Sequence, residues 1–125
     1  MMIQLPFSSQ VPTRTLFVSR DGMCFRVSGG ARIVLAAASP LRKILASIVA
    51  AHREGPRRSL SVAEIFDAGW EGANLDRHAL ANRVYCAISK LRRMGLGDVL
   101  NRTQTGYRLE PRCCVIEDVP LRMAS

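Results

Sequence analysis

The sequence has no long run of apolar residues. Although 48% of its 125 residues are hydrophobic, no stretch approaches the ~18 apolar residues that a membrane-spanning helix needs. The N-terminus, residues 1–7, lacks the basic start and apolar core of a signal peptide. We therefore expect a cytoplasmic protein with no membrane contact.

The residue types that build catalytic sites are also scarce. The chain has two histidines and neither a Gly-x-Ser-x-Gly motif, a phosphate-binding loop nor paired carboxylates. Glu64 is explained as a helix cap and Glu54 as a charge at a helix end. We expect no catalytic residues, no cofactor and no enzymatic activity.

Cysteines are few and do not form a metal-binding pattern. Cys24, Cys86, Cys113 and Cys114 show neither a Cys-x-x-Cys pair nor zinc spacing with histidine. We expect no metal site and reduced thiols, as in a cytoplasmic protein. A redox role for the adjacent pair Cys113 and Cys114 is the alternative.

Acidic residues are few compared with basic ones, and the excess of positive charge is concentrated in one part of the sequence. The chain has 18 Lys and Arg against 10 Asp and Glu, for a net charge of +8 and a pI near 10.4. Residues 76–108 hold seven cations and two anions, which is +5 of that charge. Such a surface favours polyanions, although a solvated basic face would have the same composition. With few aromatics, double-stranded DNA is favoured over single-stranded RNA.

The length fits one domain. We predict an N-terminal arm at residues 1–13, a domain at 14–111, and a tail or extra strand at 112–125. Within the domain, short β-like segments at 15–19, 23–27 and 32–36 are separated by glycine-containing turns. They predict a three-stranded antiparallel meander with one face exposed to solvent.

Two helices are predicted next. Ser39 and Pro40 begin the first in the usual manner of a cap and first helical residue, and Gly55 and Pro56 end it. Its apolar stripe comprises Leu41, Ile44, Leu45, Ile48 and Val49. The second begins with a capping box at residues 61–64 and stops near Gly69.

A basic helix and a hairpin follow. Leu80, Val84, Ile88 and Leu91 form an apolar stripe that predicts a helix over 76–94, packed on the first helix and ended by Gly95. Residues 98–109 predict two strands and a turn, with Tyr107 and Leu109 facing inward and Arg108 outward.

Two helices joined by a short turn, with the second one basic, are typical of the helix-turn-helix that places a helix in the major groove. On that helix Asn82 could bond an adenine edge, and Arg83 or Lys90 a guanine edge. Arg92 and Arg93, near the end of the helix, suit phosphates or a partner in the core, and for Arg92 an internal salt bridge is an equal alternative.

The segments Val84-Tyr85-Cys86-Ala87-Ile88-Ser89-Lys90-Leu91-Arg92-Arg93 and Thr105-Gly106-Tyr107-Arg108-Leu109 resemble the effector domain of OmpR/PhoB-type transcriptional regulators. The resemblance extends over roughly residues 15–110. It implies an α+β winged helix-turn-helix fold, with an N-terminal antiparallel meander, three helices and a C-terminal β-hairpin wing. It further implies a recognition helix at about 76–94 in the major groove, and a wing at about 98–109 on the adjacent minor groove or backbone.

The chain departs from this family at several positions. Tyr85 and Ala87 replace acidic and histidine residues, Asn82 replaces an arginine, and the basic wing position falls on Thr103, beside Arg102. The family's specific base contacts therefore do not transfer. We also expect no preceding receiver domain and hence no phosphorylation control of the usual kind.

The predicted function is a sequence-specific DNA-binding transcriptional regulator, associated with the nucleoid. Its possible partners are double-stranded DNA and a second copy on paired half-sites. The alternative is a winged-helix interaction module that binds RNA polymerase or another regulator. The predicted DNA-binding residues are Arg77, His78, Asn82, Arg83, Cys86, Ser89, Lys90, Arg93, Arg102 and Thr103.

Overall fold

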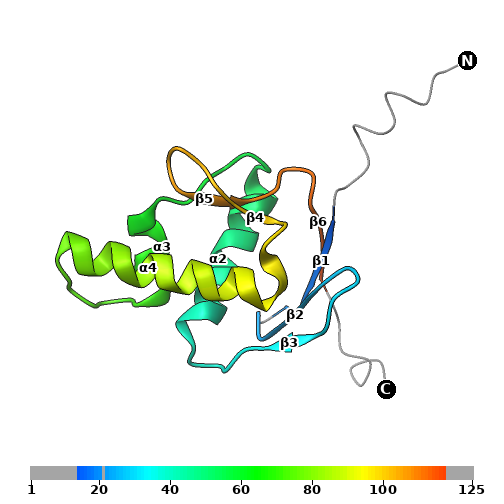
Figure 1. The fold of residues 1–125 in the computed structure, drawn as a ribbon, viewed down its shortest axis with the longest axis horizontal. Helices are drawn as coiled ribbons and strands as arrows, with labels where there is room; N and C mark the ends of the chain where they lie inside the picture. The colour runs from blue at the N-terminus through cyan, green and yellow to red at the C-terminus, as the bar shows by residue number, and fades with distance from the viewer. Residues whose placement is uncertain (1–13, 21, 118–125) are drawn as a thin grey trace, which may run out of the picture.

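The computed structural model describes residues 14–20 and 22–117. The predicted arm at 1–13 and the last eight residues of the predicted tail lie outside the described residues. Figure 1 shows the helices beside a small sheet, with a hairpin at the top of the view. The elements are β1 (Thr15–Val18), β2 (Cys24–Val27), β3 (Ile33–Val34), α2 (Pro40–Glu54), α3 (Val62–Gly69), α4 (Arg77–Leu91), a π-helical turn (Arg92–Leu96), β4 (Leu100–Arg102), β5 (Tyr107–Leu109) and β6 (Cys114–Glu117).

The predicted meander is confirmed, with a shorter third strand. β1 pairs antiparallel with β2, and β2 with β3. β3 has two residues instead of the predicted five. The Leu35 amide still donates to the Met23 carbonyl at 2.6 Å, but a turn closed by the Ser39 amide and the Ala36 carbonyl then leads the chain towards α2.

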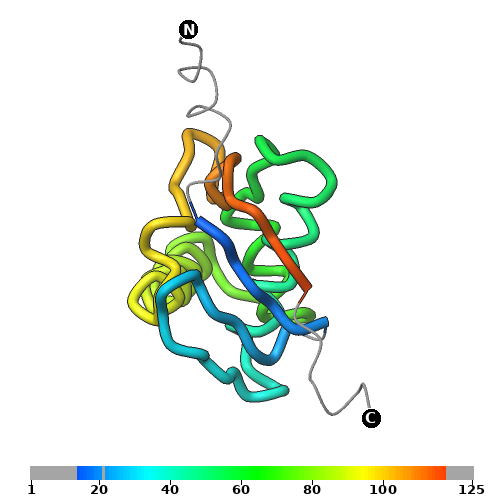
Figure 2. Tube along the Cα trace, turned by 90° about the vertical axis from the view of Figure 1, so that its right-hand side faces the viewer, coloured from blue at the N-terminus to red at the C-terminus, as the bar shows by residue number. Residues whose placement is uncertain are grey.

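The sheet has a fourth strand. It lies within residues 112–125, for which the sequence allowed either a tail or an extra strand. β6 pairs parallel with β1, with Leu16 opposite Val115, and the strand order is β3-β2-β1-β6. The Cys114 amide donates to the Arg14 carbonyl at 3.0 Å. Figure 2 shows β6 alongside β1, so the chain returns after the hairpin to the sheet where it began.

The helices begin where their caps predict. The Ser39 hydroxyl accepts from the Leu41 amide, and Pro40 is the first residue of α2. Ser61 and Glu64 form the capping box of α3, and Asp76 caps α4 by accepting from the Ala79 amide at 2.8 Å. Local sequence therefore sets all three starts.

The end of α4 differs from the prediction. The regular helix ends at Leu91, not Met94, and a wider turn over Arg92–Leu96 follows. Gly95 has φ +130°, a conformation that L side chains rarely adopt. The wide turn brings Leu96 into the core, where its side chain is fully buried.

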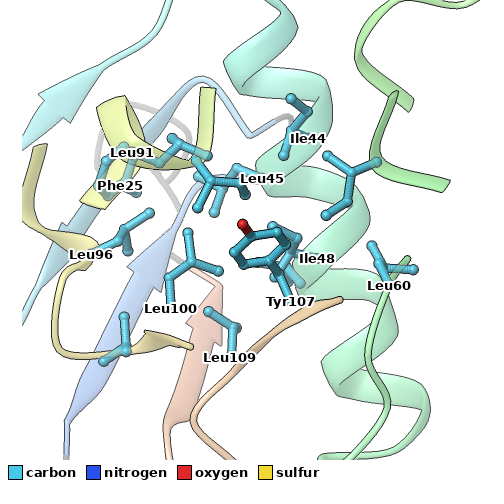
Figure 3. Packing of buried hydrophobic residues seen from close by; sticks show 14 of the residues in the cluster. Phe25, Ile44, Leu45, Ile48, Leu60, Leu91, Leu96, Leu100, Tyr107 and Leu109 are labelled. Atoms are coloured by element: carbon cyan, nitrogen blue, oxygen red, sulfur yellow. The ribbon is translucent and has the colours of Figure 1, made fainter. Parts of the chain in front are cut away.

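One core lies between the sheet and the helices (Figure 3). α4 packs against α3 as well as α2, rather than on the first helix alone. Val84, Ile88 and Leu91 of the predicted stripe are buried, whereas Leu80 is only half-buried. The stripe therefore sets how α4 docks, and its far side is left to solvent.

The predicted hairpin is confirmed, and a third segment holds it. β4 pairs antiparallel with β5. Leu60, between α2 and α3, exchanges two backbone hydrogen bonds with Tyr107, of 2.8 and 2.9 Å. Tyr107 and Leu109 are buried and Arg108 lies between them on the other face, as predicted. The wing is thus fixed to the helices by backbone pairing.

Candidate nucleic-acid interface

The solvent side of α4 carries half of the predicted site. Successive residues of an α-helix are turned by about 100°, so the side opposite Val84 and Ile88 is formed by a separate set of polar side chains. Of this set, Ser89 is half-buried and the others are exposed. Its members are His78, Asn82, Cys86 and Ser89 on α4, and Arg93 on the turn that follows it. Arg77 is exposed in the first turn of the helix.

Ser89 and Arg93 act as a pair. The Arg93 guanidinium donates to the Ser89 hydroxyl at 2.8 Å, one turn back along the helix. This bond holds the arginine along the surface of α4. The two residues therefore present one joint polar group rather than two independent ones.

One flank of α4 faces a groove of about 370 Å³, which we call the tryptophan groove. The Arg83 guanidinium carbon lies 6.0 Å from the centre of the Trp70 ring, within reach of a cation–π attraction. Trp70 itself stacks on Phe66 with ring centres 5.3 Å apart, so it packs at the end of α3. The groove is lined by Ser39, Pro40, Leu41, Trp70, Asn82, Arg83, Cys86, Ala87 and Lys90.

The other flank of α4 faces the wing across a cleft of about 620 Å³, which we call the helix–wing cleft. Three guanidinium groups border it, from Arg92 on the turn after α4, Arg102 on β4 and Arg108 on β5. The other lining residues are Tyr85, Ile88, Ser89, Asn101 and Tyr107. Among residues 14–20 and 22–117, no acidic side chain lines this cleft or the tryptophan groove.

Two of the three cleft arginines are held by backbone carbonyls. Arg92 donates to the carbonyl of the buried Leu100, so it has an internal partner, which is a backbone carbonyl instead of the carboxylate of a salt bridge. Arg108 donates to the Arg57 carbonyl at 3.1 Å, while its buried Nε has no partner among the described residues. Both guanidiniums keep their full charge while fixed in position.

Tyr107 adds a hydroxyl to the same cleft. Burial raises the pKa of Tyr107 above its usual value, and the neighbouring Arg102 and Arg92 charges only partly oppose this. The phenol therefore keeps its proton over the whole physiological range. It can donate a hydrogen bond to an anion in the cleft.

The two predicted wing residues differ in their surroundings. Arg102 is exposed. Thr103 is half-buried, and its hydroxyl lies 2.9 Å from that of Ser59 and accepts from the amides of Thr105 and Gly106. In this structure Thr103 shapes the wing turn.

Sequence reasoning missed several residues that line these surfaces. It did not include Trp70, Arg108 or Asn101 in the site, and it assigned Tyr107 to the core alone. Alternation along β5 placed Arg108 outward, which is the one signal that could have identified it. The positions of Trp70 and Asn101 depend on how α3 and β4 pack beside α4.

Two other kinds of site are absent from the described residues. Over residues 14–20 and 22–117, no cluster of three or more His, Cys, Asp or Glu side chains could hold a metal ion. No helix in the described part is long and apolar enough to cross a membrane.

Comparison with known proteins identifies the fold. The structure is similar to the DNA-binding domain of the response regulator AdeR, solved in complex with an intercistronic region, with a TM-score of 0.55 and 19% identity over 76% of this chain and 93% of that one. The DNA-binding domain of E. coli CadC covers 79% of this chain and 94% of its own at 16% identity, with a TM-score of 0.43. No protein-family profile matches the sequence, and no curated protein matches it. The likeness to the AdeR domain, together with the element order, shows a winged-helix fold.

Proposed function

We propose that this winged-helix domain binds double-stranded DNA in a sequence-specific manner and regulates transcription. In this proposal α4 lies in the major groove, and the wing meets the adjacent minor groove or backbone. The observation that carries it is the polar solvent side of α4 beside a cleft lined by three arginines and no carboxylate. The similar AdeR domain was solved in complex with an intercistronic region, which supports DNA binding in general.

The middle of α4 is the part proposed to read bases. Asn82, Cys86 and Lys90 recur along the helix and are all exposed. An Asn side chain can bond both N6 and N7 of adenine, and a Lys or Arg side chain can bond O6 and N7 of guanine. Arg83 lies at the edge of this surface because of its contact with Trp70, and it reaches either a base or the flanking backbone.

The helix–wing cleft is the part proposed to hold a phosphate backbone. When a helix occupies the major groove and a wing the next minor groove, the strand between the two grooves passes between helix and wing. Arg92, Arg102 and Arg108 border that passage, and the Tyr107 hydroxyl can donate to a phosphate oxygen. Such contacts add affinity for all sequences and set the position of α4.

Selection of bound duplexes from a random pool, followed by anisotropy titrations, tests the proposal. Lys90→Ala should reduce the preference for the selected site over scrambled DNA by about tenfold, since a good base contact is worth about 1–3 kcal/mol. Arg102→Ala should weaken binding to both DNAs alike. Lys43→Ala, an exposed cation of α2 outside the proposed interface, is the control and should change neither. Failure of the protein to retain any duplex at low salt would refute DNA binding.

The second candidate function is an interaction module that binds RNA polymerase or another regulator. The apolar floor of the tryptophan groove, with Pro40, Leu41 and Trp70 beside α4, is the observation that favours it. A stoichiometric protein partner whose binding is lost in Leu41→Asp, and which competes with DNA for α4, would establish this function. A partner that binds without competition would leave the DNA proposal intact.

A further inference from the structure

The outer face of the four-stranded sheet is more apolar than a solvent-facing sheet surface usually is. Leu16, Val18 and Phe25 point into the core and are buried. On the opposite face Val34 is 68% exposed and Ile116 43% exposed. These are two of the three large hydrophobic side chains that are exposed among the described residues, the third being Tyr85 on α4.

The strand register places these side chains in one continuous strip. Phe17 of β1 is opposite Ile116 of β6 on one side and Arg26 of β2 on the other. The Arg26 guanidinium carbon lies 4.2 Å from the centre of the Phe17 ring. In the next row Val34 is opposite Cys24, whose sulfur accepts from Arg32 at 3.6 Å. Ile116, Phe17 and Arg26 therefore form one row across β6, β1 and β2, and Cys24 and Val34 continue the surface in the next row.

The charge that the described residues give this face is positive, and it comes from Arg26 and Arg32. Glu117 follows the outward Ile116 and is opposite the buried Val18, so it lies on the other side of β6, where it pairs with Arg20 at 3.0 Å. A second copy of the same face would bring arginines against arginines, which disfavours self-association through it. An acidic partner would instead be attracted.

We propose that the sheet patch, formed by Phe17, Arg26, Arg32, Val34 and Ile116, docks an acidic segment of another protein that carries apolar side chains between its carboxylates. Exposed apolar side chains with arginine beside them are typical of the centre of protein interfaces. Figure 2 looks onto the sheet, with the helices behind it. The patch is built from none of the residues of α4 or the wing, so its occupation leaves the proposed DNA surface open.

The probe for the test is a synthetic amphipathic peptide with a leucine stripe bordered by glutamates, and its counterpart with lysine for glutamate. Added to the ¹⁵N-labelled full chain, the glutamate peptide should shift amide signals of β1, β2, β3 and β6, and leave those of α4 unchanged. The combined change Val34→Ser and Ile116→Ser should weaken this binding about tenfold or more. Tyr85→Ser removes the third exposed large hydrophobic side chain and is the matched control, with no expected effect.

A second variant keeps the test independent of folding. Arg26→Glu with Arg32→Glu retains the apolar strip and should reverse the preference, so that the lysine peptide binds better than the glutamate peptide. Signal shifts centred on α4 and the wing, equal binding to the serine variant, or equal binding of the two peptides would each overturn the proposal. Patch signals that shift with protein concentration alone would show that a second copy occupies the face, which would also overturn it.

Discussion

Gly106 shows how one residue fixes the wing to the helices. A Cβ atom at this position would lie 1.8 Å from the carbonyl oxygen of Leu60, the same oxygen that accepts from the Tyr107 amide. No rotation of a side chain relieves such a contact, because both atoms belong to the backbone. Packing therefore explains each residue of the Gly-Tyr-Arg motif. Gly106 allows the backbone to approach Leu60, Tyr107 lines the helix–wing cleft, and Arg108 lies on the opposite face of β5, where it donates to the Arg57 carbonyl.

We predict that Gly106→Ala lowers the free energy of unfolding by roughly 2–4 kcal/mol, since it forces apart a backbone pairing. Gly72→Ala is the control, because Gly72 also has positive φ (+83°) but no atom within 4 Å of its would-be Cβ. That change should cost only about 1 kcal/mol from its backbone conformation. Urea unfolding of both variants measures the difference, and equal losses would refute the role given to Leu60.

Cys113 links one buried side chain to the pH dependence of stability. Burial raises the pKa of its thiol from 9.0 to about 11, with smaller contributions in the same direction from Cys114 and Glu110. The unfolded chain therefore releases this proton at lower pH than the folded one. The contribution of the thiol to stability is complete below pH 9 and is lost as the pH rises towards 11.

We predict that between pH 9 and 11 this thiol lowers the free energy of unfolding by about 1.4 kcal/mol per pH unit. In Cys113→Ala this part of the slope should be absent. Cys86→Ala, which removes an exposed thiol, should keep it. Guanidine unfolding at several pH values gives the slopes, and parallel curves for the wild type and Cys113→Ala would contradict the prediction.

At the scale of elements, β6 is the least expected part of the fold. Its partner β1 lies at the other end of the domain sequence, so no local sequence pattern could have predicted the parallel pairing. Val115 packs on the core, while its neighbour Ile116 is exposed on the outer face. β6 thus contributes to the core on one side and to the sheet patch on the other.

Because Val115 and Ile116 face opposite sides of β6, we expect substitutions at these two positions to change the free energy of unfolding by very different amounts. Val115→Asp should lower the free energy of unfolding by about 1–3 kcal/mol, because it brings a carboxylate against the apolar core. Ile116→Asp should change it by less than about 0.5 kcal/mol. Thermal and urea unfolding distinguish the two, and equal effects would mean that β6 does not pair with β1 in the observed register.

Two arginines fix the wing to the helical part of the domain, and neither belongs to a salt bridge among the described residues. Arg92 joins the end of α4 to β4, and Arg108 joins β5 to the loop after α2. Both bonds go to carbonyls and leave the positive charge without a carboxylate partner. The width of the cleft and its charge therefore come from the same side chains.

At the scale of the whole molecule, the net charge of +8 is unevenly distributed over the surface. Arg83 and Lys90 lie on α4 and Arg93 on the turn after it, and Arg92, Arg102 and Arg108 border the cleft beside them. The sheet patch carries further arginines on another face. The proposed nucleic-acid surface and the proposed protein surface thus have similar charge but different shapes and different amounts of exposed apolar area.

If about six phosphates are neutralised by these cations, the logarithm of the DNA association constant should fall with the logarithm of salt concentration with a slope of roughly −5. Affinity should then drop roughly a thousandfold between 50 and 200 mM salt. Anisotropy titrations on the selected duplex measure the slope. A slope shallower than about −2 would show that the cleft arginines do not meet phosphates.

The sequence by itself determined the features that depend on neighbouring residues. Caps at Ser39, Ser61 and Asp76 begin the helices, the apolar stripes choose the buried faces, and glycine-containing turns separate the strands of the meander. The order of these elements, with the motif around Val84 and Gly106, was sufficient for the winged-helix fold. These interactions span a few residues, so the sequence states them directly.

Only the tertiary structure decided what joins distant parts of the chain. It placed β6 beside β1, ended α4 at Leu91, and gave Arg92 and Arg108 their carbonyl partners. It also brought Arg83 over the Trp70 ring, and it placed the Thr103 hydroxyl where it accepts hydrogen bonds within the wing turn. An arginine or a threonine can bond many different groups, and its choice is set by which backbone the fold brings within reach rather than by its own position in the sequence.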